Sequence, residues 1–196
     1  MGLRELKAAR TRQTLTDVAL DLFLRHGYDQ TTMEQVAEHA DVGTTTLYRY
    51  FPTKDQLLLD PLVEAIDPTP HLRDRPFDEA VATTLGAALL SVADTLDESD
   101  ARISQIRRLV DAAPSVRAKL WDRFRTLRDD LELVVAERMG LPATDLSVRA
   151  TAGLTLDVFQ MIDRRAGDPR THREIVLELL GALPHSTIVF PAAPAT

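Results

Sequence analysis

Two short helical segments joined by a tight turn are the feature that most constrains the fold of this chain. Thr32-Met33-Glu34-Gln35 is a capping box, in which the side chains at its two ends each accept a backbone N–H, and it predicts a helix from about Met33 to Ala40. Asp41-Val42-Gly43 predicts a turn. Pro52 disfavours helix at the residue before it, so the next helix covers Thr44 to about Phe51. Two such helices around such a turn have the dimensions of a helix-turn-helix.

An amphipathic helix precedes this motif, and a further helix follows it. From about Thr11 to His26, apolar residues recur at helical spacing, and Gly27 follows as a residue that can end the helix in a left-handed conformation. Thr53-Lys54-Asp55-Gln56 is a second capping box, which predicts a helix that runs to about Ile66. Prolines at 68, 70 and 76 then mark a break in the chain.

The rest of the chain keeps a helical pattern, with no competing strand signal. Glycine and proline punctuate most of the junctions, as helix ends predict. The expected helices cover about 77–97, 100–112, 115–139, 144–166 and 170–183. The predicted fold class is therefore all-α, with a three-helix domain containing the helix-turn-helix at 1–53, a larger helical domain at 54–186 and a tail at 187–196.

The composition of the 196-residue chain excludes several classes of protein. It contains no cysteine, which removes disulfides and thiolate metal sites. Its five histidines form no i, i+4 pair with a nearby third ligand, and neither a P-loop nor a G-x-S-x-G motif occurs. We therefore expect no metal, no cofactor and no enzymatic activity. A polar N-terminus and the lack of a run of about 18 apolar residues predict a cytoplasmic protein without a membrane segment.

The net charge of −7 limits how this chain can bind nucleic acid. A uniformly acidic surface is repelled by phosphate, so any contact with DNA must be local. The first twelve residues contain Arg4, Lys7, Arg10 and Arg12 but only one acidic residue, Glu5. This basic end is either a DNA-binding arm or, as is more common for short charged ends, a solvated segment.

A set of short motifs occurs in order over roughly the first 60 residues. They are Ala19-Leu20-Asp21-Leu22-Phe23, Gly27-Tyr28, Thr31-Thr32-Met33, Val36-Ala37, Val42, Thr46-Leu47-Tyr48-Arg49-Tyr50-Phe51 and Lys54-Asp55-Gln56-Leu57. Together they resemble the DNA-binding domain of the TetR family of one-component regulators. The remaining chain is similar to that family in being helical and of comparable length. The resemblance implies a DNA-binding domain followed by a ligand-binding and dimerisation domain.

The resemblance also implies which residues contact DNA. It makes about Met33–Ala40 the first helix of the motif and Thr44–Tyr50 the recognition helix, with Thr44 and Thr45 reaching base edges in the major groove. The full set of implied contacts is Thr32, Thr44, Thr45, Thr46, Tyr48, Arg49, Tyr50 and Lys54. The others would bind backbone phosphates, although a solvated Arg49 and packing roles for the two tyrosines are the alternatives.

Base reading is where this sequence departs from the family pattern. Many members of the family have serine or another capping residue at the position of Gly43, and long polar side chains at the positions of Thr44 and Thr45. Threonines cannot make the bidentate contact by which arginine recognises guanine. Specificity would then depend on methyl contacts, water or DNA shape.

The C-terminal half has two expected tasks. Leu109, Trp121, Phe124 and Phe159 are candidates for lining a ligand pocket between helices, with ordinary core packing as the alternative. By resemblance, the helices within about 144–183 would pair with their copies in a second subunit, although they could equally pack within one chain.

These expectations combine into one predicted function. The chain would be a homodimeric transcriptional regulator of double-stranded operator DNA, acting as a repressor that an unknown small molecule releases. The alternative is a helical ligand-binding or structural dimer that has lost sequence-specific reading of DNA.

Overall fold

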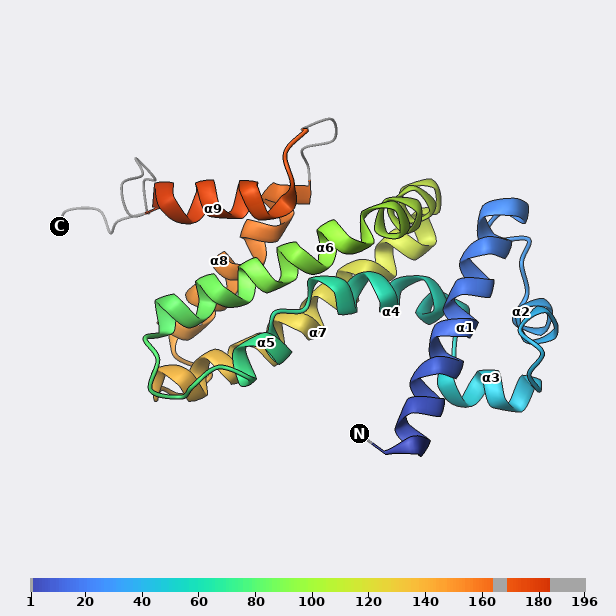
Figure 1. The fold of residues 1–196 in the computed structure, drawn as a ribbon, viewed down its shortest axis with the longest axis horizontal. Coiled ribbons are helices and arrows are strands. Elements are labelled where there is room, and N and C mark those ends of the chain that lie inside the picture. The colour runs from blue at the N-terminus through green and yellow to red at the C-terminus, as the bar shows by residue number, and fades with distance from the viewer. Residues whose placement is uncertain (1, 164–168, 184–196) are drawn as a thin grey trace. The chain divides into compact units, whose positions relative to one another are not determined.

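The computed structural model describes residues 2–163 and 169–183, apart from the side chains of Asp100 and of residues 159–163. Every regular element in these ranges is a helix, which confirms the predicted all-α class (Figure 1). The helices are α1 (Leu3–His26), α2 (Met33–His39), α3 (Thr44–Tyr50), α4 (Lys54–Ile66), α5 (Thr69–Arg73), α6 (Val81–Ala112), α7 (Pro114–Met139), α8 (Leu146–Asp163) and α9 (His172–Ala182). The tail expected at 187–196 lies outside the described residues.

The chain divides into two compact units. The first contains the residues up to Asp67 together with Ser99–Asp130, and the second contains Pro68–Glu98 together with the residues from Leu131 onward. The boundary falls within α6 and again within α7, so each of these long helices contributes to both units. Of the helices in the described ranges, none has the length and apolar character needed to cross a membrane.

Local sequence signals position the helices of the first unit. The Thr32 side chain accepts the N–H of Gln35 at 3.2 Å, and the Gln35 side chain accepts the N–H of Thr32 at 2.8 Å, so the predicted capping box starts α2. Gly27 ends α1 with a positive φ of 87°, which a residue without Cβ adopts readily. These features confirm the predicted boundaries of the helix-turn-helix.

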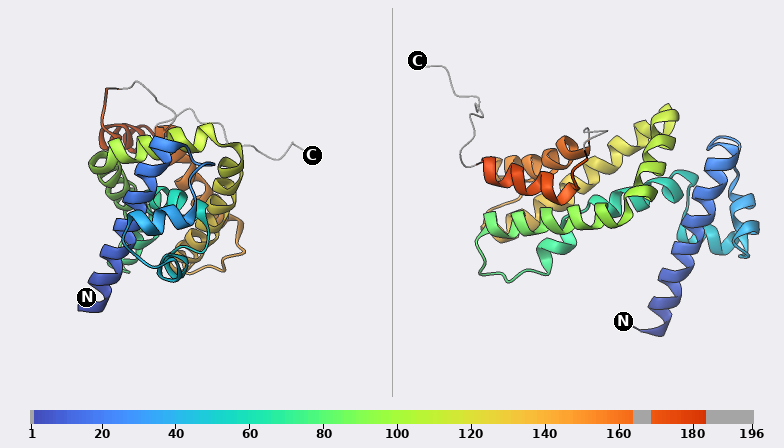
Figure 2. Two further views of the ribbon diagram at one scale, coloured as in Figure 1. Left: turned by 90° about the vertical axis from the view of Figure 1, so that its right-hand side faces the viewer. Right: turned by 45° about the horizontal axis from the view of Figure 1, so that its top comes forward.

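A small apolar core holds these helices together. Leu15 of α1, Val36 of α2, Leu47 of α3 and Phe51 are fully buried. The Arg12 guanidinium lies 4.5 Å from the centre of the Phe51 ring, which places Phe51 against α1. Because α3 has only 7 residues, it is too short to be stable in isolation, and its place depends on this burial. Figures 1 and 2 show α2 and α3 on one side of α1, with the N-terminal turns of α1 extending beyond α3.

Two of the predicted helix boundaries were wrong. α1 begins at Leu3 rather than near Thr11, because its first turns contain good helix formers but bury no face that would give an amphipathic pattern. The segments expected at 77–97 and 100–112 form one helix, α6, since no glycine or proline separates them. The segment with the prolines also forms a short helix, α5, that was not predicted.

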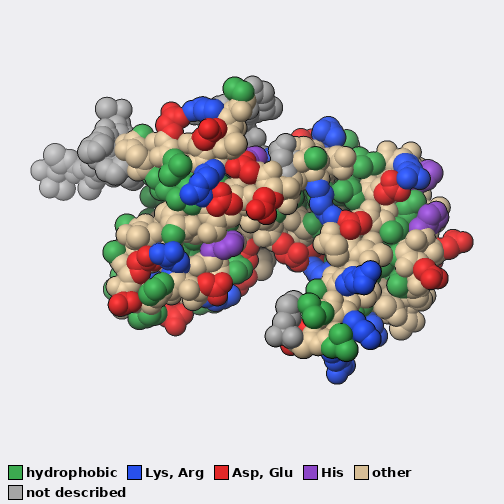
Figure 3. Space-filling view, viewed as in Figure 1, with side chains coloured by type: hydrophobic (Ala, Val, Ile, Leu, Met, Phe, Trp, Pro, Cys, Tyr) green, Lys and Arg blue, Asp and Glu red, His purple; other side chains and the backbone are tan. Residues whose placement is uncertain are grey.

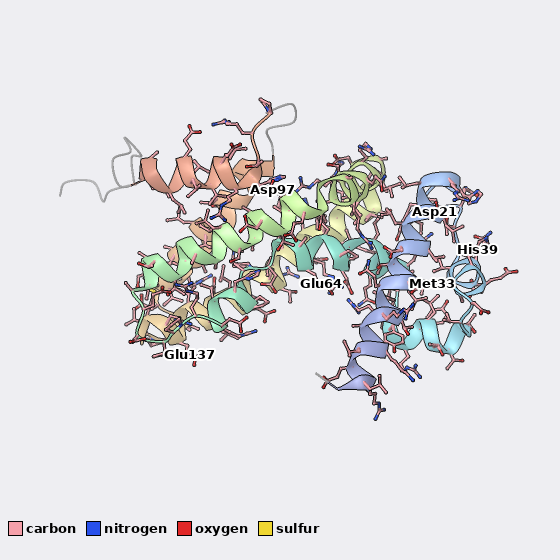
Figure 4. All side chains as sticks on the ribbon, in the orientation of Figure 1. Asp21, Met33, His39, Glu64, Asp97 and Glu137 are labelled. Carbon is pink, nitrogen blue, oxygen red and sulfur yellow. The ribbon has the colours of Figure 1, made fainter. Side chains whose placement is uncertain are left out.

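In the second unit, Asp97 of α6 fixes the start of α9 (Figure 4). Its carboxylate accepts the backbone N–H of His172 at 2.8 Å and that of Arg173 at 3.1 Å, and the His172 Nδ1 lies 2.7 Å from the same carboxylate. Partial burial opposes ionisation, but these hydrogen bonds hold the pKa of Asp97 below its ordinary value. A charged cap from α6 therefore adds to the capping box that α9 begins with at Thr171.

We expect Asp97→Ala to lower the free energy of unfolding by about 1–2 kcal/mol at neutral pH, because N–H groups at the start of α9 lose a charged acceptor. Urea denaturation followed by circular dichroism measures this loss. Asp94→Ala is the matched control on the same helix. Asp94 pairs with the exposed guanidinium of Arg173 at 2.7 Å, and such a surface pair contributes at most about 1 kcal/mol.

The loss caused by Asp97→Ala should also depend on pH. The folded-state pKa of Asp97 is lowered from 3.8, so its stabilisation is complete above that value and disappears as the pH falls through the folded-state pKa. The wild type and the variant should therefore converge in stability as the pH falls well below 3.8. A gap that stays constant with pH would show that the loss comes from packing instead.

Candidate nucleic-acid interface

The outer side of α3 carries most of the residues that were predicted to contact DNA. Thr44, Thr45 and Arg49 are exposed and Tyr48 is 43% exposed, whereas Leu47 is fully buried. Side chains four residues apart lie one turn apart on the same side of a helix, so Tyr48 follows Thr44 and Arg49 follows Thr45. α3 thus presents two short threonines at its start and two longer side chains one turn later.

Thr46 and Tyr50 form the third such pair on α3, and both are half-buried. The Arg49 guanidinium lies 5.4 Å from the centre of the Tyr50 ring. Of the two tyrosines, Tyr48 is therefore the more accessible, and Tyr50 lies beside a cation that is itself exposed.

α2 brings one hydroxyl and one carboxylate to the same area. The capping contact uses Thr32 Oγ1 as an acceptor, and a hydroxyl still has its O–H to donate. The Tyr48 hydroxyl donates to Glu34 Oε1 at 3.3 Å. Desolvation, together with the negative charge of Glu34, raises the pKa of Tyr48. The Tyr48 hydroxyl therefore stays protonated, as a hydrogen-bond donor must, at neutral pH.

The ammonium group of Lys54, at the start of α4, binds backbone carbonyls of the same chain. Its Nζ donates to the backbone carbonyl of Tyr28 at 2.8 Å and to that of Thr31 at 3.0 Å, and it lies 3.5 Å from that of Asp29. It also lies 4.3 Å from the centre of the Tyr28 ring. Since an ammonium group has three N–H donors, these contacts occupy all of them. Lys54 thus ties α4 to the loop before α2.

Asp60 of α4 is shared by two arginines from other helices of the first unit. Arg12 of α1 donates to it at 2.9 Å, and Arg123 of α7 pairs with its other carboxylate oxygen. Arg12 also pairs with Glu64, one turn further along α4, at 2.8 Å. Asp60 is therefore part of an ionic network that joins three helices.

Two more ion pairs reinforce the same unit. Lys119 of α7 donates to Asp55 of α4 at 2.6 Å and, against the opposing effect of partial burial, lowers the pKa of Asp55. Arg102 of α6 pairs with Asp17 of α1 and donates to the Thr16 hydroxyl at 2.9 Å. α4, which directly follows the helix-turn-helix, is thus connected by charge to a helix from the C-terminal half.

The candidate ligand residues are not brought together in an evident site. Leu109 and Phe124 are half-buried in the first unit, whereas Trp121 is 59% exposed and so does not line an enclosed cavity. Trp121 and Phe124 form a tilted ring pair with centroids 6.0 Å apart. The side chain of Phe159 lies outside the described part of the structure. Among the side chains that are described, no cluster of three or more His, Asp or Glu could hold a metal ion.

Two features of this interface were not predicted from the sequence. The proximity of Glu34 to Tyr48 depends on how the turn folds α3 back onto α2, and no local pattern signals it. The internal role of Lys54 depends on carbonyls more than twenty positions earlier in the chain. Only the aromatic Tyr28 at the end of the preceding motif hints at a partner for this cation.

Two family models match the chain. The model described as "Bacterial regulatory proteins, tetR family" matches residues 15–60, which span the helix-turn-helix. The model described as "MftR C-terminal domain" matches residues 79–180, more than half of the chain.

Individual proteins show the same similarity. The chain is 32% identical over 152 residues to the HTH-type transcriptional regulator TcmR of Streptomyces glaucescens, covering 74% of this chain and 67% of that protein. It is 43% identical over 56 residues to the HTH-type transcriptional repressor KstR of Rhodococcus jostii RHA1, covering 29% of this chain and 26% of that protein. The solved structure of Salmonella enterica GusR has a TM-score of 0.56 at 20% identity, covering 88% of this chain and 92% of that chain, and supports the fold.

The contacts of Lys54 generate a prediction that separates an internal role from a phosphate contact. We expect Lys54→Met to lower the free energy of unfolding by about 2 kcal/mol, because partly buried carbonyls lose a charged donor. Urea denaturation measures this change. Arg117→Met is the control, since the exposed Arg117 side chain should contribute little to stability. Unchanged stability of Lys54→Met combined with weaker DNA binding would instead support the direct phosphate contact.

Proposed function

Because the chain belongs to the TetR family of DNA-binding transcriptional regulators, we propose that it acts as a homodimer that binds a pseudo-palindromic operator and releases it when a small molecule binds. The observation that carries the proposal is the exposed row of Thr44, Thr45, Tyr48 and Arg49 on α3, above the buried Leu47. A buried face holds the helix, and an accessible face carries hydrogen-bonding groups for DNA.

The proposed contacts are of two kinds: some read the base sequence, and the others position the protein on the DNA backbone. Thr44 and Thr45 read base edges in the major groove, where a hydroxyl meets polar groups and a methyl meets thymine. Thr32, Thr46, Tyr48, Arg49 and Tyr50 bind backbone phosphates and set the register of the protein on the duplex. Lys54 acts indirectly, because its ammonium holds the loop that leads into α2.

Hydroxyl groups dominate this grip on DNA. Four of the five proposed phosphate-binding residues are threonine or tyrosine, which donate hydrogen bonds without neutralising phosphate charge. Glu34 places a negative charge beside one of them, at 3.3 Å from the Tyr48 hydroxyl. The proposed interface therefore depends on fit and hydrogen bonding more than on net charge, as suits a chain whose charge is −7.

The proposed dimer is formed by the helices within 144–183. Leu154 of α8 and Leu177 of α9 are large apolar residues that remain exposed in the single chain, 52% and 49% respectively. α8 and α9 also contact each other, so they present these leucines from one helix pair. Pairing of two copies through such a pair would bury these side chains in a four-helix interface.

Release by a small molecule needs a connection between the C-terminal helices and the helix-turn-helix. The pairs Asp60–Arg123 and Asp55–Lys119 supply one, because they tie α4 to α7 within the first unit. The ligand site itself is proposed for α6 and α7 of the first unit, with Leu109 and Phe124 kept as candidates. Repression is the proposed mode of action, as the name of the similar KstR states for that protein.

In vitro selection of random duplexes by the purified protein tests the proposal. We expect enrichment of a two-fold symmetric sequence. Tyr48→Phe should weaken binding to all duplexes by roughly 30-fold, since exchanging Glu34 for a phosphate as the acceptor of the Tyr48 hydroxyl contributes about 1 kcal/mol and is lost in both subunits. Thr44→Ala should instead change which base is preferred at one position of each half-site. Fluorescence anisotropy measures both effects.

Two outcomes would count against this reading. Equal weakening of all duplexes by Thr44→Ala would show that Thr44 does not read bases. A folded, dimeric protein that enriches no sequence at low salt would favour the alternative of a helical dimer without sequence-specific DNA reading.

The proposed dimer interface gives a further prediction. Leu177→Glu should convert the dimer into a monomer, because a charge would be buried without a partner in the interface. Light scattering after gel filtration measures the mass. Leu133→Glu on α7 is the matched control, since Leu133 is 60% exposed in the same unit but lies outside the proposed interface. Dimers of unchanged mass from both variants would place the interface elsewhere.

A further inference from the structure

We infer that the first turns of α1 form a second DNA-contacting element, in which Arg4 and Lys7 bind the sugar-phosphate backbone beside the bases that α3 reads. The inference rests on the proposed function, because it requires α3 to lie in the major groove. It assigns a role to the basic N-terminal end, for which the sequence alone left two alternatives, a DNA-binding arm and the more common solvated segment.

The geometry places this end of α1 beside the recognition helix. An open groove of about 770 Å³ is lined by Arg4, Lys7 and Thr11 of α1 and by Arg49 and Tyr50 of α3. All of these residues belong to the first unit. Two views of the ribbon show the N-terminal turns of α1 extending past α3 (Figures 1 and 2). The groove therefore lies between a projecting helix end and the end of the helix that reads DNA.

The groove continues the DNA-facing side of α3. Arg49 lies one turn after Thr45 on the same side of the helix, a distance of about 6 Å along its axis. A duplex whose bases meet Thr45 would bring its backbone toward Arg49 and then toward the α1 side chains. Arg49 and Tyr50 thus belong both to the proposed DNA contacts and to this groove.

The charges of the groove are available for an anion. In the described ranges no carboxylate pairs with Arg4, Lys7 or Arg49. Arg12, further along α1, is by contrast paired with Asp60 and Glu64. Lys and Arg side chains gather over this end of α1 in the space-filling view (Figure 3). A local group of unpaired cations in a chain of net charge −7 is complementary to phosphate.

The form of the groove favours a DNA backbone over a small molecule. Its volume is within the range of ligand pockets, but such pockets enclose most of their ligand's surface, whereas this groove is open. Here three cations line an open surface, and the apolar Leu3 at its edge is 71% exposed. A polyanion that passes along the groove matches this arrangement.

The salt dependence of binding to a duplex selected by the wild-type protein tests the inference. Each lost phosphate contact lowers the slope of log K against log salt by about 0.9, so Arg4→Gln/Lys7→Gln should lower it by about 3 to 4 across two subunits. Fluorescence anisotropy between about 50 and 200 mM NaCl measures the slope. Arg117→Gln/Arg128→Gln removes the same charge from exposed positions on α7 and should leave the slope nearly unchanged.

Hydroxyl-radical footprinting adds a second readout. The wild type should protect backbone positions at the edge of each half-site that the Arg4→Gln/Lys7→Gln variant leaves open, while the base preference stays the same. Equal slopes and footprints for the two double variants, both with wild-type circular dichroism, would overturn the inference and leave the proposed function intact. Failure of the wild type to select any duplex would overturn the proposed function itself.

Discussion

The burial of two side chains, Leu47 and Phe51, is the constraint on which the proposed interface depends. α3 has only 7 residues, and a helix of two turns has little stability of its own. Both side chains are fully buried, and the Phe51 ring lies 4.5 Å from the Arg12 guanidinium on α1. Because this packing fixes the rotation of α3 about its axis, it also decides that Thr44, Thr45, Tyr48 and Arg49 face outward.

Two cations near α3, Lys54 and Arg12, hold this framework. Lys54 joins the start of α4 to the carbonyls of the loop before α2, and Arg12 joins α1 to two carboxylates of α4. Both also lie over an aromatic ring, Tyr28 for Lys54 and Phe51 for Arg12. The side chains of α2 and α3 that are proposed to meet DNA are mostly neutral hydroxyls. Lys54 and Arg12 therefore stabilise the geometry of the motif from within, and few positive charges remain accessible on α2 and α3.

Local signals in the sequence were enough to predict the helix-turn-helix. The capping box at Thr32 and Gln35, the glycine at 27 and the proline at 52 each act within a few residues, so their effects are readable without tertiary structure. The family resemblance then pointed to the exposed residues of α3. The same local reasoning failed where a helix lacks a stop signal, as in the continuous α6, or lacks an apolar face, as in the first turns of α1.

Long-range contacts could not be predicted in this way. Asp60 binds arginines that lie 48 and 63 positions away in the chain, and no periodicity links residues at such distances. Lys54 shows the same limit, because a lysine at the start of a helix is equally compatible with a phosphate contact and with an internal one. Only the folded arrangement of carbonyls around its Nζ distinguishes the two.

Because α6 and α7 are shared between the two units, the DNA-binding domain of such a regulator cannot simply be fused to another effector domain. Lys119, Arg123 and Arg102 come from the C-terminal half of the sequence, yet their carboxylate partners Asp55, Asp60 and Asp17 belong to the N-terminal part. A chimera that grafted residues 1–67 onto an unrelated effector domain would leave Asp55 and Asp17 without their cations, and Asp60 would keep Arg12 alone. A working fusion therefore has to include the turns of α6 and α7 that carry Arg102, Lys119 and Arg123.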